Sequence, residues 1–141
     1  MTIFSSDEED RIMHAINVAE NHTSGEIRLC IEKKCKNDVI QQATKRFAEL
    51  GMHKTALKNG VLIFLAIDDH KFAIIGDAGI NEKVPENFWE ETKDLMTSFF
   101  KKGEIVEGLI AGIERSGTQL KTYFPRSDDD INELPNEVVY F

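Results

Sequence analysis

The stretch Val61-Leu62-Ile63-Phe64-Leu65-Ala66-Ile67 decides the fold, because seven apolar residues follow one another without alternation. A strand that is covered on both faces has this composition, so the stretch predicts the central strand of a sheet. The polar break Asp68-Asp69-His70-Lys71 has the length of a hairpin and leads into a second apolar run at residues 72–75. This run is expected to return as an antiparallel strand.

Before this centre, the sequence predicts two helices with a strand between them. An apolar stripe at helical spacing indicates a helix over residues 7–21, and Ser6-Asp7-Glu8-Glu9 has the form of a capping box at its start. Residues 26–32 alternate with a period of two, which is typical of a strand with one covered face. A second helix is expected over residues 39–50, ending at Gly51.

After the hairpin, the sequence predicts a tight turn and two longer helices. The turn is Gly76-Asp77-Ala78-Gly79, whose glycines are expected to supply backbone angles that other residues avoid. Pro85 suits a first helical position, and a wide apolar face follows up to residue 100. Apolar residues then recur every three or four positions over residues 106–124, which indicates a long final helix.

The order of these elements predicts the fold class. A strand, a helix and the central strand should form a right-handed parallel crossover, which places helices on both faces of the sheet. The fold class is therefore α/β, a three-layer α/β/α sandwich with a small mixed sheet. One domain is expected over residues 1–125, followed by an acidic tail over residues 126–141. We expect this tail to be an extended arm whose apolar end could dock.

Composition limits the possible functions. Lys and Arg number 17 against 25 Asp and Glu, and the net charge of −8 disfavours nucleic-acid binding. Two cysteines are too few for a disulfide scaffold and favour a reducing compartment. The sequence has neither a secretory signal pattern nor an apolar stretch of about 18 residues. We therefore expect a cytoplasmic monomer without a nucleic-acid or membrane partner.

Acidic residues at the two ends of the predicted sheet are the candidate site. Glu26, Asn59 and Asp77 should meet at one end, and Asp68 and Asp69 lie on the hairpin at the other. Their oxygens suit Ca²⁺ or Mg²⁺, and a bound metal could position water for attack on a phosphate. The alternative is structural: a solvated strand start, an Asx turn and a hairpin tip that faces water. No motif identifies catalytic residues or an organic cofactor.

At these residues the chain resembles the TPM domain family, also called the TPM phosphatase family. The likeness covers roughly residues 8–124 and is most evident to small stand-alone bacterial members. It rests on an ordered set of motifs: Thr23-Ser24-Gly25-Glu26-Ile27-Arg28, Lys58-Asn59-Gly60-Val61-Leu62-Ile63, Asp68-Asp69-His70-Lys71, Ile75-Gly76-Asp77-Ala78-Gly79-Ile80 and Phe99-Phe100-Lys101-Lys102-Gly103-Glu104.

The resemblance implies an α/β/α sandwich, divalent ion binding by acidic loop residues, and phosphatase activity as the function associated with the family. Where many members have a Gly-aromatic-Gly pattern, this chain has Asp77, which adds a carboxylate near Glu26. We expect a divalent cation, Ca²⁺ or Mg²⁺, to be bound by Glu26, Asp68, Asp69 and Asp77. The alternatives are a metal-assisted phosphomonoesterase that uses the same acids, and a metal-free interaction module with an acidic docking tail.

Overall fold

The computed structural model describes residues 3–126 and 138–141. No helix in these two ranges combines the length and the apolar composition that crossing a membrane requires. The elements are α1 (Ser6–Glu20), β1 (Glu26–Glu32), α2 (Val39–Glu49), the 3-10 helix η1 (Met52–Lys54), β2 (Gly60–Ala66), β3 (Lys71–Gly76), α3 (Ala78–Asn81), α4 (Phe88–Phe100), α5 (Ile105–Tyr123) and β4 (Val139–Tyr140).

The sheet has the order β3-β2-β1-β4 and mixes parallel with antiparallel pairs. β1 and β2 are parallel, with Glu26 opposite Gly60, as the predicted crossover requires. β3 returns antiparallel to β2, with Val61 opposite Gly76, which confirms the predicted hairpin. β2 is therefore the central strand of the three that were predicted from the sequence.

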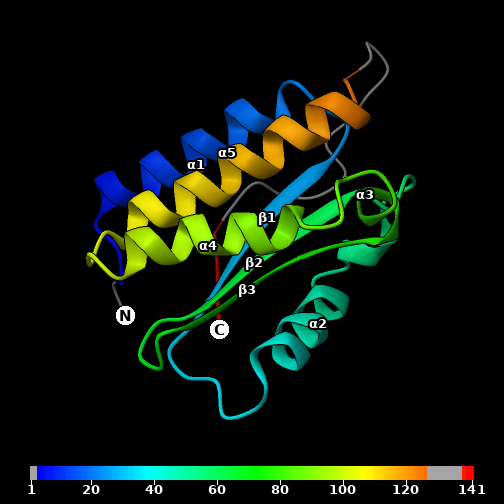
Figure 1. Cartoon of the computed structure of the whole chain (residues 1–141). Coiled ribbons are helices and arrows are strands. Elements are labelled where there is room, and N and C mark those ends of the chain that lie inside the picture. Colours follow the sequence, from blue (N-terminus) through cyan, green and yellow to red (C-terminus); the bar gives the residue numbers. More distant parts are fainter. Residues whose placement is uncertain (1–2, 127–137) are drawn as a thin grey trace.

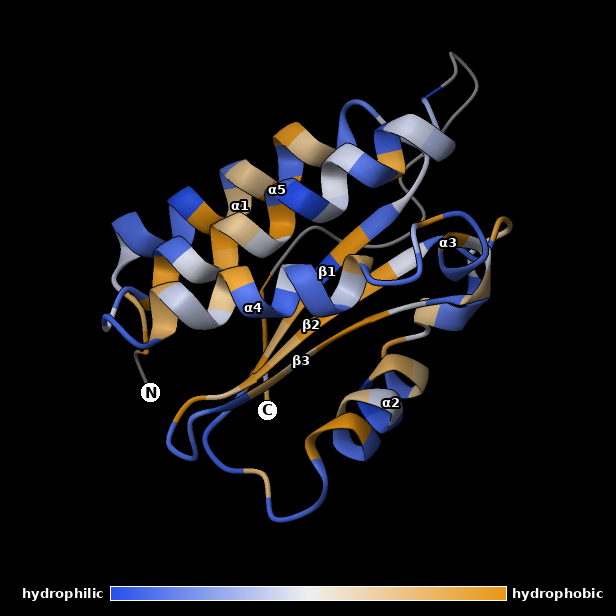
Figure 2. Ribbon diagram, in the orientation of Figure 1, coloured by the Kyte–Doolittle hydropathy of each residue, from blue (hydrophilic) through white to orange (hydrophobic). Residues whose placement is uncertain are grey.

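Helices cover both faces of this sheet, which confirms the three-layer sandwich (Figure 1). α1, α4 and α5 lie on one face, and α2 lies on the other. Alternate residues of β2 supply the two cores: Ile63 packs under the three helices, while Phe64 packs with Phe47 of α2. Figure 2 shows the strands as mainly hydrophobic ribbons between helices with polar outer surfaces.

β1 is buried on both faces, so the prediction of a half-covered strand was wrong. All seven of its residues are buried. Cys30, on the face expected to be open, packs in the same core as Ala43 and Phe47 of α2. Arg28, at 7% exposed, is buried as well. The alternation in the sequence reflects polar side chains held in the interior.

The capping box of α1 begins one residue earlier than predicted. Ser5 is the N-cap: its hydroxyl accepts from the Glu8 amide at 3.1 Å, and the Glu8 carboxylate accepts from the Ser5 amide at 2.9 Å. Phe4 is buried in the core directly before the cap. Docking of this ring therefore sets where the chain enters the helix.

The glycines of the turn after β3 serve close packing, which corrects the expectation of unusual backbone angles. Within the described residues, positive φ among glycines occurs only at Gly51 and Gly103. A Cβ on Gly79 would lie 2.1 Å from the carbonyl oxygen of Leu57 and 2.6 Å from that of Lys58. Gly79 is needed because α3 lies directly against that loop backbone.

The chain end returns to the sheet as a fourth strand. Val139 lies opposite Cys30 and Tyr140 opposite Ile31, both in parallel register. The apolar end of the expected arm therefore docks on the free edge of β1. The rest of that arm, residues 127–137, lies outside the described residues.

Candidate functional site

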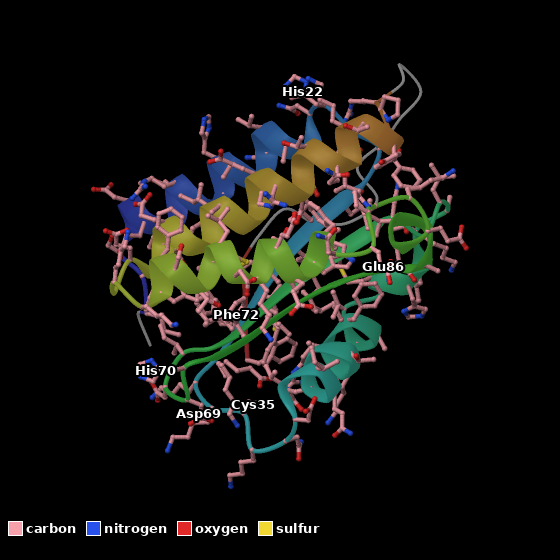
Figure 3. The ribbon with its side chains drawn as sticks, viewed as in Figure 1. His22, Cys35, Asp69, His70, Phe72 and Glu86 are labelled. Atoms are coloured by element: carbon pink, nitrogen blue, oxygen red, sulfur yellow. The ribbon has the colours of Figure 1, made fainter. Side chains whose placement is uncertain are left out.

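The four predicted ligands lie at opposite ends of the sheet and do not form one site. Glu26 and Asp77 are at the end where β2 begins, whereas Asp68 and Asp69 follow its last residue. β2 has seven residues, so its two ends are roughly 20 Å apart at about 3.3 Å per residue. Figure 3 shows Asp69 at the hairpin, far from the end that carries His22.

Topology brings Glu26, Asn59 and Asp77 to neighbouring positions, as predicted from the sequence. The Glu26 amide donates to the Asn59 carbonyl at 3.4 Å, and the Asp77 amide donates to the Gly60 carbonyl at 2.9 Å. These two bonds join the start of β1, the start of β2 and the end of β3. We call this part of the molecule the amino end of the sheet.

Asp77 has one satisfied and one unsatisfied carboxylate oxygen. Oδ1 accepts from the Ala78 amide at 2.8 Å and caps α3, so the side chain does form the local turn contact considered as the alternative. Oδ2 is buried and accepts no hydrogen bond within the described part of the chain. A buried anionic oxygen without a partner is costly, and a cation is the group that would offset this cost.

The turn that carries Asp77 packs against a neighbouring loop and against α4. The carbonyl groups of Leu57 and Lys58 lie against Gly79, two residues beyond Asp77. Asn81 donates to the Gly76 carbonyl at 2.8 Å and accepts from the Trp89 indole at 2.8 Å. These contacts fix the position of the turn relative to the loop at Leu57 and to α4.

Glu20 is the acidic residue that sequence reasoning missed. It ends α1, is 5% exposed, and accepts from the Ile27 amide at 2.8 Å through Oε2. The pKa of Glu20 is raised to about 8, chiefly by burial and also by the charge of Glu26 and a hydrogen bond between the two carboxyl groups. The hydrogen bond from the Ile27 amide and the charge of Arg126 act in the opposite direction. Near neutral pH Glu20 therefore keeps its proton beside Glu26.

One sequence signal could have identified Glu20. The last turn of α1 holds no basic residue and ends on an acid, at the helix end whose dipole disfavours negative charge. An acid at that position is costly unless it is neutral or paired. The contact with Glu26, however, depends on how α1 packs against β1, which no spacing in the sequence reveals.

At the hairpin, the Asp69 carboxylate and the Asp68 backbone make structural contacts. Asp69 accepts from the Cys35 amide at 2.6 Å, and the Asp68 amide donates to the Lys33 carbonyl at 2.8 Å. Figure 3 shows Cys35 and Asp69 side by side, which joins the hairpin to the loop 33–38. That loop contains three lysines. Their charge disfavours a further cation at this end of the sheet.

The molecule is an α/β/α sandwich domain. Its open four-stranded sheet lies between a layer of three long helices and a layer formed by α2. The model of the TPM domain matches residues 1–119, and the chain belongs to the TPM domain family. The resemblance seen in the sequence motifs is thereby confirmed. No curated protein matches the chain.

Solved structures support this assignment. The BA42 protein from the bacterium Bizionia argentinensis is 44% identical, with a TM-score of 0.92 over 99% of this chain and 97% of that one. The N-terminal domain of a protein from P. gingivalis shares 18% identity, with a TM-score of 0.71 over 86% of this chain and 79% of that one. The N-terminal domain of the cg2496 protein from Corynebacterium glutamicum shares 12% identity, with a TM-score of 0.68 over 93% of this chain and 82% of that one.

Proposed function

We propose that this TPM domain binds a divalent cation, Ca²⁺ or Mg²⁺, at the amino end of the sheet, with Asp77 as its principal ligand. The observation that carries the proposal is the buried Oδ2 of Asp77, which has no hydrogen bond partner in the described part of the chain. A hard cation would satisfy this oxygen. Asn59 and Glu26 stand at the neighbouring strand ends and are the proposed further oxygen ligands.

The small number of acidic ligands limits the affinity of the proposed site. Among the described residues, no three His, Cys, Asp or Glu side chains gather closely enough to hold a metal ion. The cation would therefore depend on Asp77, with Glu26 as a second acid, and on neutral oxygens such as the amide of Asn59. A site with so few charges should bind Ca²⁺ with a Kd on the order of 10⁻⁴ to 10⁻³ M.

Phosphatase activity is the weaker alternative. Stabilising the charge of a transferring phosphate requires a cationic group at the site. Arg28 is the arginine closest in sequence to Glu26, but at 7% exposed it is buried within β1. We therefore place metal-assisted phosphomonoesterase activity second, and turnover of p-nitrophenyl phosphate with added Mg²⁺ would reverse that order.

Amide chemical shifts recorded during titration with CaCl₂ and MgCl₂ test the proposal. Asp77→Asn keeps an oxygen that can cap α3 but removes the charge, so we expect binding to weaken at least about tenfold. Asp69→Asn makes the same change of charge at the hairpin and serves as the control, with binding unchanged. The proposal fails if Asp69→Asn loses binding while Asp77→Asn keeps it, or if neither ion produces saturable shifts in the wild-type chain.

A further inference from the structure

The outer edge of β1 is defined by which of its backbone groups face away from β2. The Glu26 amide donates to Asn59, and the Glu32 carbonyl accepts from the Ile67 amide at 2.9 Å. Both groups therefore face β2. In a parallel pair, alternate residues direct their backbone groups to opposite sides of the strand. The backbone amide and carbonyl groups of Ile27, Leu29 and Ile31 consequently point to the other side of the strand, which is the outer edge.

Two different groups occupy this edge. At its start, the Ile27 amide donates to the Glu20 carboxyl group at 2.8 Å. At its end, β4 lies beside Cys30 and Ile31, and the Phe141 amide donates to the Ile31 carbonyl at 2.9 Å. The second half of the edge is thus filled by the last residues of the chain itself.

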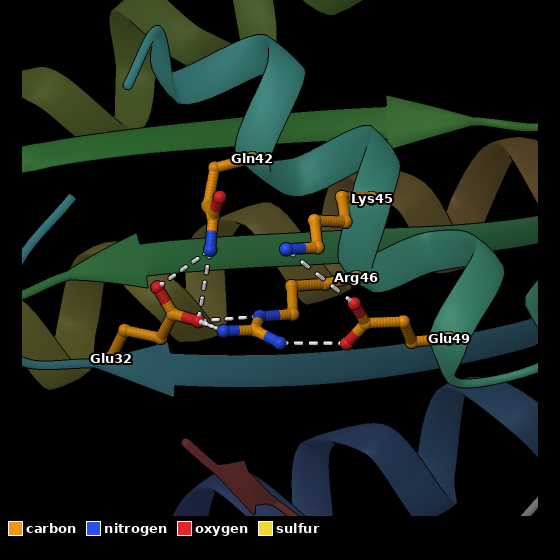
Figure 4. A network of polar contacts seen from close by, with 5 residues as sticks. All are labelled: Glu32, Gln42, Lys45, Arg46 and Glu49. Atoms are coloured by element: carbon orange, nitrogen blue, oxygen red, sulfur yellow. Dashed lines mark hydrogen bonds and ion pairs between the residues drawn. The ribbon is translucent and has the colours of Figure 1, made fainter. Parts of the chain in front are cut away.

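Side chains beside the edge are arranged to receive an aromatic ring. The guanidinium carbon of Arg46 lies 4.0 Å from the centre of the Phe141 ring. Arg46 forms ion pairs with Glu32 and with Glu49, the latter at 2.6 Å (Figure 4). The Gln42 side-chain amide donates a hydrogen bond to Glu32 at 3.3 Å. The flat cation is therefore oriented by α2 and β1, whether or not a ring lies over it.

The segment that fills the edge is held by few contacts. β4 contains only two residues, and the side chains of Tyr140 and Phe141 are 39% and 49% exposed. The Tyr140 hydroxyl donates to Glu9 at the surface. Such a short pairing with half-exposed aromatic residues buries little apolar area, so it can be displaced.

We propose that the outer edge of β1 beside Arg46 binds an extended peptide, and that residues 138–141 occupy this edge in the free protein. Its partner is an extended peptide in which an aromatic residue follows an apolar pair. Backbone pairing with β1 would supply affinity, and the ring on Arg46 would supply selectivity, as in other cases of strand addition. This inference is independent of the cation site, because it uses neither Asp77 nor the amino end of the sheet.

The chemistry of the partner follows from the segment already bound. Val138 and Val139 are half-buried and favour an extended backbone, which suits a strand that adds to the edge. The ring of Phe141 covers the guanidinium of Arg46, a contact that an aliphatic side chain would not reproduce. A competing peptide must therefore offer an extended apolar pair followed by an aromatic residue that reaches Arg46.

A displacement experiment on the 141-residue chain tests this proposal. The probe is a fluorescently labelled peptide with the sequence of residues 136–141, and the receptor is the double variant Tyr140→Ala/Phe141→Ala. Because both side chains are substantially exposed, their removal should leave the fold intact. The wild-type tail competes at an effective concentration in the millimolar range, so the double variant should bind the probe at least about tenfold more tightly than the wild-type chain.

Two controls make the outcome specific. Tyr123→Ala removes an exposed aromatic residue of α5, away from the outer edge of β1, and should behave as wild type. A probe ending in Ala should bind about two to five times more weakly, because it lacks the ring over Arg46. The proposal is overturned if the double variant shows no saturable binding at millimolar probe, or if the wild-type chain binds equally well.

Discussion

Burial changes the acid–base chemistry of single residues around β1. Burial raises the pKa of Glu20 to about 8, so this side chain is mainly neutral at pH values where other carboxyl groups are charged. Burial also raises the pKa of the Cys30 thiol to about 12, and the nearby charge of Glu32 acts in the same direction. Cys30 is therefore a packing residue of the core and a poor nucleophile.

The raised pKa of Glu20 predicts how stability depends on pH. Between pH 4.5 and about pH 8 the folded chain holds a proton that the unfolded chain has lost, so the free energy of unfolding falls as the pH rises through this window. Glu20→Gln removes this proton exchange but can still accept from Ile27. Across this window the free energy of unfolding of the variant should therefore fall less than that of the wild-type chain, by on the order of a few kcal/mol.

Urea unfolding of both chains at the two ends of this window measures the difference. The variant should equal the wild type at the acidic end and be more stable at the alkaline end. Parallel pH curves for the two chains would show that Glu20 loses its proton as readily in the folded chain as in the unfolded one.

Single residues also show why part of the site escapes sequence reasoning. Asp77 could be singled out because a carboxylate stands in a glycine turn after a strand. The need for Gly79 could not be assigned correctly, because the contact is with Leu57, more than twenty positions away in the chain. Local spacing predicts backbone angles, whereas tertiary contacts decide close approaches.

Among the elements, α1 shows how core packing selects one of two serines that have the same capping pattern in the sequence. Both Ser5 and Ser6 are followed three residues later by a glutamate, so each has the capping-box pattern. The structure uses Ser5 because Phe4 is buried just before it. The sequence predicts the helix, and the core determines its first residue.

This assignment predicts unequal costs for two neighbouring substitutions. Ser5→Ala removes the hydroxyl that accepts from the Glu8 amide and should destabilise the chain by about 1 kcal/mol. Ser6→Ala changes a residue in the first turn and should cost only a few tenths of this. Chemical unfolding midpoints of the two variants measure the difference. A larger loss for Ser6→Ala would place the cap at Ser6.

For the whole molecule, the sheet was predictable because its central strand is an uninterrupted apolar run. The crossover from β1 to β2 and the hairpin to β3 follow from that run and from the polar break after it. α3 and β4 were not predicted, since they have only four and two residues. Elements so short carry no periodic signal and form because tertiary contacts hold them.

The candidate site was predictable to the same extent as the topology. Strand directions correctly placed Glu26, Asn59 and Asp77 together and separated them from the hairpin acids. The sequence could not show that Asp69 holds the loop 33–38 through the Cys35 amide, or that Glu20 lies beside Glu26. Both facts depend on how separate segments pack.

Manganese broadening of amide signals in the wild-type chain tests the location of the cation site most directly. Mn²⁺ takes the same oxygen ligands as Mg²⁺ and broadens the signals of nearby nuclei. We predict that substoichiometric Mn²⁺ first broadens the amides of residues 76–79 and 58–60, and that excess Mg²⁺ restores them. Selective broadening of residues 68–71 instead would place the cation at the hairpin and contradict the assignment to Asp77.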